Sequence, residues 1–337
     1  MKTIAAILVA ALIGPITIHA QTQSDRDYFA GKTITYIVAT KPGGGYDTYA
    51  RLIAEQMEKH LPGTRIRVKN VPGAGHIVGT NQLYVAKPDG FTIGTFNTGL
   101  IYAQLLQREG VKFDLTKLSW IGKAASDARV LVVSTKSGIN SFDDLRNNNE
   151  PTLFASSGVG TASHNESTLL SRTLGFDAKI IPGFSGNEGQ MAMMRGEIAA
   201  TFGSYSSMRP FIENGYGKLV LHVGGDAIFG DELPAAKDLT DNPSAKAMIA
   251  LIEALSSLAR FTAGPPGMPA GPLGVLRDAY RSALSDPALL EKAEKMRIPI
   301  DPLFGDDVAR LVTAALDQPA DNMKIISETL VPGKKKK

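Results

Sequence analysis

A glycine-rich stretch at residues 40–51 carries the side chains and backbone of this sequence that are best suited to hold a small anion. Gly43, Gly44 and Gly45 are followed closely by Asp47. Glycines let the backbone approach a ligand closely, and the free N–H groups at the start of a helix attract negative charge. A carboxylate is the most plausible ligand for such a loop. The alternative interpretation is a tight turn before a capped helix, with no ligand.

The residues on either side of this loop predict a strand, a turn and a helix. Residues 32–39 are β-branched and aromatic, which is typical of a buried strand, and apolar residues recur at helical spacing over 47–60. Pro42 fixes the turn, and Asp47 is well placed to cap the helix. The loop therefore lies at the carboxyl end of a strand, where α/β proteins bind their ligands.

The order of the remaining elements indicates an α/β fold with two lobes. Strands at 65–70 and 91–96 complete a β-α-β-α-β unit, and a second β-α-β-α series follows from 129 to 202. The last third reads as helices and is too poor in strand signals to form its own sheet. We therefore expect it to cover the first lobe, so that two crossings join the lobes around a cleft. The predicted boundaries are 25–125 for the first part of lobe 1, 126–223 for lobe 2 and 224–332 for the mostly helical second part of lobe 1.

The N-terminus predicts export. Residues 1–20 combine Lys2, an apolar run over 4–18 and a small residue, Ala20, before Gln21, which is typical of a secretory signal peptide. The alternative is a buried N-terminal helix. The sequence contains no cysteine, which excludes disulfides and thiolate metal sites. We expect a periplasmic protein whose stability rests on its apolar core.

Composition and motifs argue against nucleic-acid binding and against catalysis. The net charge of +3 is close to that of the four lysines in the basic tail, 333–337, so the folded body is nearly neutral. The five histidines never pair as H-x-x-x-H, and the glycines around Gly75 do not have the spacing of a dinucleotide fingerprint. Residues 183–186 lack the spacing of a serine elbow. We predict no catalytic residue, no metal and no cofactor; an exported hydrolase is the weaker alternative.

Four motifs, in order, resemble those of a known receptor family. They are Pro-Gly-Gly-x-x-Asp-x-x-Ala-Arg, Asn-x-Pro-Gly-Ala-Gly-Gly-x-x-Gly, Ala-x-Pro-Asp-Gly-Tyr-Thr and Ala-Ser-Ser-Gly-x-Gly-[Ser/Thr]-x-x-His, and the matching segments begin at residues 42, 70, 86 and 155. The chain is similar to the extracytoplasmic solute receptors of the tripartite tricarboxylate transporters, also called Bug proteins. The likeness runs from about residue 28 to the C-terminus.

The resemblance implies a type II periplasmic-binding-protein fold that captures a small carboxylate, di- or tricarboxylic or aromatic, between its lobes and delivers it to a membrane permease. A signalling protein as the partner is the alternative, and we expect a monomer. Carried over by position, the ligand-binding residues are Gly43, Gly44, Gly45, Asp47, Ser157, Gly160, Thr161 and His164, with Thr98 and Ser204 on neighbouring exit loops. Asp47 is expected to cap the helix or anchor water, because a carboxylate would repel the ligand.

The chain departs from the family pattern before the first glycines and after His164. Thr40 and Lys41 stand where the family has apolar and proline residues, and Asn165 stands where it has an apolar one. Lys41 either contacts a far carboxylate of the ligand or lies in solvent at the cleft rim, and the rim is favoured. These changes leave the identity of the ligand open.

Overall fold

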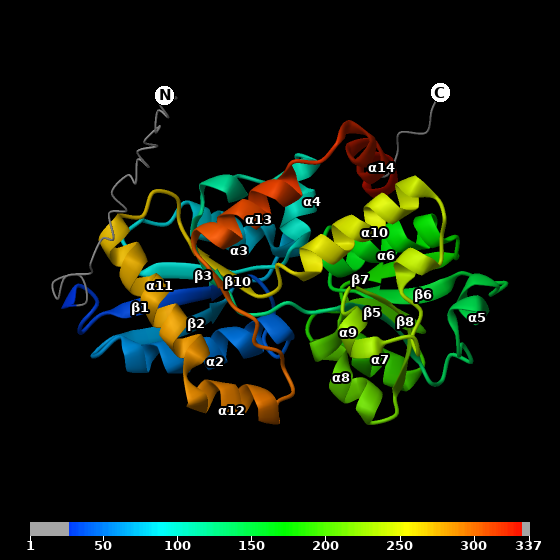
Figure 1. The fold of residues 1–337 in the computed structure, drawn as a ribbon, viewed down its shortest axis with the longest axis horizontal. Helices are drawn as coiled ribbons and strands as arrows, with labels where there is room; N and C mark the ends of the chain where they lie inside the picture. The colour runs from blue at the N-terminus through cyan, green and yellow to red at the C-terminus, as the bar shows by residue number, and fades with distance from the viewer. Residues whose placement is uncertain (1–26, 332–337) are drawn as a thin grey trace, which may run out of the picture.

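The computed structural model describes residues 27–331, which form two α/β lobes side by side (Figure 1). The predicted signal peptide, 1–20, and the basic tail, 333–337, lie outside the described residues. Within 27–331, no helix is long and apolar enough to cross a membrane.

The first lobe is built on a six-stranded sheet. Its strand order is β11-β4-β10-β3-β1-β2. The parallel pairing of β1 with β2 and β3 is the β-α-β-α-β unit predicted from the sequence. The bounds are β1 (Thr33–Val38), α2 (Gly45–His60), β2 (Arg65–Asn70), α3 (Ile77–Tyr84), β3 (Thr92–Thr95), α4 (Gly99–Leu105), β4 (Ser119–Lys123), β10 (Phe261–Gly264) and β11 (Leu303–Phe304).

The second lobe is built on a five-stranded sheet with the order β7-β6-β8-β5-β9. Strands β6, β7 and β8 run parallel, while β5 is antiparallel to both β8 and β9. The bounds are β5 (Arg129–Ser134), α5 (Phe142–Arg146), β6 (Thr152–Ser156), α6 (Ala162–Leu174), β7 (Ala178–Pro182), α7 (Glu188–Arg195), β8 (Ala200–Ser204), α8 (Tyr205–Glu213) and β9 (Gly217–Val223).

The C-terminal third is shared between the two lobes, whereas the sequence predicted that all of 224–332 would join the first. Helices α10 and α14 contact α6 of the second lobe, while α11 contacts α2 and β4 of the first (Figure 1). The bounds are α9 (Asp226–Phe229), α10 (Pro243–Ser256), α11 (Ala270–Ser285), α12 (Pro287–Lys295), α13 (Asp306–Leu316) and α14 (Ala320–Leu330).

The chain therefore crosses between the lobes three times, not twice. The crossings are residues 124–128, 257–260 and 317–319. The first two are hydrogen-bonded to each other: the Ala124 N–H donates to the Arg260 carbonyl at 3.2 Å, and the Asp127 N–H donates to the Ser256 carbonyl at 3.1 Å.

Strands β10 and β11 of the first sheet lie in the last third, which the sequence predicted to be helical. Helix α10 ends at Ser256, and the chain then enters β10 between β3 and β4. Four residues are too few to show a strand period, so this strand is specified by its pairing in the sheet. Its Phe261 packs against Phe96 and Trp120, with ring centroids 4.9 and 5.3 Å away.

Replacing Phe96 with alanine should destabilise the protein by about 3–5 kcal/mol, because a fully buried ring leaves a cavity in this aromatic cluster. Urea unfolding followed by the fluorescence of the single tryptophan, Trp120, measures the change. The control is Val85→Ala, whose side chain is 73% exposed and whose loss should cost less than about 0.5 kcal/mol. Equal effects of the two variants would contradict the packing described here.

Candidate functional site

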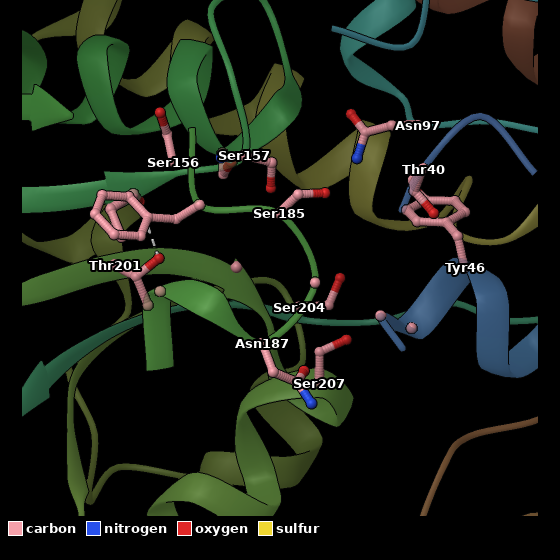
Figure 2. Close-up of a pocket in the computed structure, with 18 of the residues that line it drawn as sticks. Thr40, Tyr46, Asn97, Ser156, Ser157, Ser185, Asn187, Thr201, Ser204 and Ser207 are labelled. Atoms are coloured by element: carbon pink, nitrogen blue, oxygen red, sulfur yellow. Dashed lines mark hydrogen bonds between the residues drawn. The ribbon is translucent and has the colours of Figure 1, made fainter. Parts of the chain in front are cut away.

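A polar cavity of about 120 Å³ lies between the two lobes. Figure 2 shows Thr40, Tyr46 and Asn97 on one side of it, and Ser156, Ser185 and Thr201 on the other. The lining residues follow the carboxyl ends of strands in both sheets, as expected for an open α/β sheet. The cavity therefore occupies the cleft that the sequence predicted.

The glycines of the first loop let the lobes approach each other. Gly44 caps α2, and both Gly44 and Gly45 line the cavity. A Cβ atom on Gly45 would lie 2.7 Å from Ser207 Oγ, and one on Gly44 would lie 3.2 Å from Gly186 Cα. Larger residues at these two positions would push the second lobe away.

Asp47 stabilises the glycine loop from outside the cavity. Neither Asp47 nor Gly43 lines the cavity. The helix cap is Gly44, so Asp47 does not occupy the cap position predicted for it. Instead its carboxylate accepts hydrogen bonds from the Gly43 N–H at 3.0 Å, from Arg51 Nη2 at 2.9 Å and from Asn70 Nδ2 at 2.9 Å. Burial acts to raise the pKa of Asp47, but these hydrogen bonds outweigh it and lower the pKa.

In the segment 157–164, which follows β6 and enters α6, Ser157 lines the cavity, whereas Gly160, Thr161 and His164 do not. Thr161 caps α6, and its hydroxyl donates to the Gly158 carbonyl at 2.7 Å. Gly160 lies against the Arg108 guanidinium of the first lobe. His164 also lies near Arg108; burial lowers the pKa of this imidazole and Arg108 lowers it further. These three residues shape the loop and its contact with the first lobe.

The two residues predicted on neighbouring exit loops, Ser204 at the end of β8 and Thr98 after β3, differ in whether they line the cavity. Ser204 lines the cavity and its hydroxyl accepts a hydrogen bond from Arg129 Nη1 at 3.0 Å. Thr98 is buried and does not line it, whereas its neighbour Asn97 does. The Asn97 Oδ1 accepts hydrogen bonds from the Gly99 N–H and, across the cleft, from the Ala162 N–H at 2.9 Å.

Two buried arginines in the cavity wall were not predicted from the sequence. Arg129 Nε donates to Glu166 Oε2 at 2.7 Å, and Arg260 Nη2 donates to Asp127 Oδ2 at 3.0 Å. Burial raises the pKa of Glu166, with Arg129 acting against it. Arg129 begins a fully buried strand, which is an unusual place for a charge, but no local pattern reveals its distant partner.

Tyr46 lies close enough to both arginines for their positive charges to act on its hydroxyl. The Arg260 guanidinium lies over its ring, 4.6 Å from the centroid. Burial raises the pKa of the Tyr46 hydroxyl, and Arg260 and Arg129 oppose that rise. The phenol therefore stays neutral and can donate a hydrogen bond within the cavity.

Two ion pairs join the lobes outside the cavity wall. Lys41 lies at the rim of the cleft, as favoured from the sequence, and its Nζ is 3.1 Å from Glu188 Oε1 of the second lobe. Arg297 of the first lobe lies 2.5 Å from Glu213 of the second. Both pairs are well exposed, so they add little to the stability of the fold.

Two α/β lobes that enclose a polar cavity define the class of two-lobed periplasmic binding proteins, and this confirms the predicted fold. The model of one family, "Tripartite tricarboxylate transporter family receptor", matches residues 49–329. The chain belongs to this family, which the resemblance had indicated.

Relatives of known sequence or structure agree with this assignment. A UPF0065 protein of Bordetella pertussis is 27% identical over 291 residues, covering 84% of each chain. The solved periplasmic binding protein BugD is 20% identical, with a TM-score of 0.73 over 88% of this chain and 97% of its own. MatC from Rhodopseudomonas palustris, solved with bound malate, is 21% identical, with a TM-score of 0.70 over 88% of this chain and 99% of its own.

Family membership makes the chain a transport receptor and not an enzyme. The receptors of this family work outside the cytoplasm. Among residues 27–331, no group of three or more acidic or histidine side chains is placed to hold a metal ion.

Replacing Asp47 with asparagine should cost about 1–3 kcal/mol of unfolding free energy at pH 7, because the loop loses a buried, charge-assisted set of hydrogen bonds. The folded-state pKa of Asp47 lies below the ordinary value of an aspartate, so the ionised carboxylate stabilises the fold above that ordinary pKa. Its contribution is lost as the pH falls through the lowered pKa. Urea unfolding at pH 7 and pH 3 should show the difference from the native protein shrinking at pH 3.

The matched control for this prediction is Asp241→Asn, which removes a fully exposed carboxylate far from the loop. It should change the unfolding free energy little at either pH. A cost of Asp47→Asn that is the same at both pH values would show that the carboxylate charge is not what holds the loop.

Proposed function

We propose that this protein is a periplasmic receptor that captures a small carboxylate in the interlobe cavity and delivers it to the permease of a tripartite tricarboxylate transporter. The observation that carries the proposal is that four helices begin at the cavity wall. Residues in the first turns of α2, α6, α7 and α8 line it: Gly45, Ser163, Gln190 and Ser207. Each helix start offers an anion a partial positive charge, together with those first-turn N–H groups that are not already bonded within the protein, as the N–H groups of Ala162 and Ser206 are.

The formal charges in the wall support this reading. Arg129 and Arg260 are each paired with a buried acid, so these four groups sum to zero. An anion would therefore be held by helix N-termini, backbone N–H groups and the hydroxyls of serine and threonine, which replace its water. Such a site binds a carboxylate reversibly without a permanent ion pair.

The size of the cavity supports a small ligand. Its volume of about 120 Å³ is near the roughly 150 Å³ of an engineered cavity that holds one benzene molecule. Acids with a few carbon atoms fit this space. Two solved proteins of the same fold contain such acids, malate in MatC and adipate in another R. palustris protein.

Within this proposal, the predicted site residues take two roles. Gly44, Gly45, Ser157 and Ser204 line the cavity and contact the ligand. The other six hold the loops in place: Gly43, Asp47, Thr98, Gly160, Thr161 and His164. The signal peptide would direct the chain to the periplasm, where the lobes close on the ligand.

A thermal-shift screen of residues 21–337 against mono-, di- and tricarboxylic and aromatic acids tests the proposal. An acid that binds only the folded protein should stabilise it by about 2.7 kcal/mol at 100 times its dissociation constant, and so raise the melting temperature. We expect the largest rise with short acids. Amides of the same acids are the control and should have no effect. No rise with any acid would contradict the proposal.

Substitution of Gly44 in steps of size tests the location of the site. Gly44→Ala places a Cβ atom 3.2 Å from Gly186 Cα and should weaken binding only moderately. Gly44→Val should lower the affinity for an acid found in the screen by more than about 100-fold, because the lobes no longer close. Isothermal titration measures the affinity, and circular dichroism checks the fold. Binding of undiminished strength to the valine variant would place the ligand elsewhere.

A further inference from the structure

His76 has a strained backbone in the wall of the cavity. Its φ angle is +80°, in the left-handed region, and it is the last of four consecutive residues with positive φ, from Gly73 to His76. Glycine occupies this position in the motif that the segment resembles, and it adopts this conformation at no steric cost. Strain of this kind persists where the structure around it demands it, often at a ligand site. The strained backbone of His76 therefore indicates a functional role for the imidazole.

The His76 ring has one nitrogen that is buried without a partner. The side chain lines the cavity, the residue is only 7% exposed, and Nδ1 has no hydrogen-bond partner. The ring is hydrogen-bonded to the backbone of Ala39. Because Nδ1 is unpaired, the nitrogen that donates to the Ala39 carbonyl is Nε2. Burial lowers the pKa of His76 to about 4, so the ring is neutral at pH 7 and Nδ1 carries a lone pair.

Thr40 presents a second polar atom of the same kind. It directly follows Ala39, it lines the same cavity, and its Oγ1 is buried without a hydrogen-bond partner. Buried polar groups are normally paired, so an unpaired one in a cavity wall is a candidate partner for a bound ligand.

We propose that His76 Nδ1 and Thr40 Oγ1 form a subsite for a hydrogen-bond donor on the ligand, so that the protein prefers acids carrying a hydroxyl or an ammonium group. This inference rests on the proposed function, because it specifies which carboxylates the same cavity selects.

The chemistry of Nδ1 decides which ligand group fits. A carboxylate oxygen would place a lone pair against a lone pair, whereas an O–H or N–H group satisfies the nitrogen. The Thr40 hydroxyl can accept from the same group or donate to a neighbouring carboxylate oxygen. An acid without a donor would leave Nδ1 buried and unsatisfied, which is the costly arrangement. The ring of Tyr46 lies 6.5 Å from the His76 ring, so the subsite is next to the start of α2.

Isothermal titration at pH 7.5 with matched acids tests the proposal. The pairs are propionate and lactate, succinate and malate, and glutarate and 2-hydroxyglutarate, with alanine, aspartate and glutamate as the ammonium series. We expect at least one substituted acid to bind about 5-fold or more tighter than its unsubstituted partner, which corresponds to one net hydrogen bond. Comparing the two series shows whether the donor is a hydroxyl or an ammonium.

The variants His76→Gly and Thr40→Val should reduce that preference, measured as the ratio of the two affinities, to about 3-fold or less. His76→Asn tolerates the left-handed backbone and offers an amide acceptor, so it should keep part of the preference. The control is Ala74→Gly, which relaxes the same turn at φ +45° without removing a polar side chain, and it should leave the preference intact.

The outcomes separate this inference from the proposed function. Equal affinity for matched acids in the native protein, or a preference that survives both His76→Gly and Thr40→Val, overturns the subsite while carboxylate binding stands. A loss of preference in Ala74→Gly as well would assign the effect to the turn and not to the imidazole. Failure of every acid to bind overturns both.

Discussion

The buried ion pair between Asp127 and Arg260 is the interaction on which the arrangement of the two lobes depends. Asp127 belongs to the first crossing and Arg260 to the second, and both side chains are almost fully buried. The Asp127 carboxylate also accepts from the Ser206 N–H and hydroxyl at the start of α8. The Asp127 carboxylate thus connects the first crossing with the second crossing and with α8 of the second lobe. Because Arg260 lines the cavity as well, the same group that holds the lobes together forms part of the wall of the proposed binding site.

The balance of charge in the cavity explains how a site can attract anions and still release them. Two arginines and two acids cancel, and the remaining attraction comes from helix starts and hydroxyls. Selectivity then depends on which lone pairs and protons face the ligand and less on its total charge. The unpaired atoms of Thr40 and His76 are therefore more informative about the ligand than the arginines are.

The sequence predicted those parts of the protein that local patterns specify. The parallel strand–helix units and the glycine loop before α2 follow from periodicity and turn chemistry. Strand β10 and the attachment of α10 and α14 to the second lobe do not, because distant pairing determines them. Arg129 and Arg260 were not predicted as cavity residues for the same reason, because only the fold brings them together with their distant acidic partners. His76 was open to detection, since a histidine replaces a glycine in a turn that requires positive φ.

The third crossing sets a limit on the opening of the cleft. The segment 317–319 links α13 of the first lobe to α14 of the second, and three residues reach only about 10 Å when fully extended. The first two crossings form a hydrogen-bonded ribbon, so they bend together. A short tether beside such a ribbon removes the freedom to twist and leaves one bending motion of restricted amplitude. We therefore expect the cleft to open through a small angle only, because the three-residue link limits how far the lobes can separate on that side.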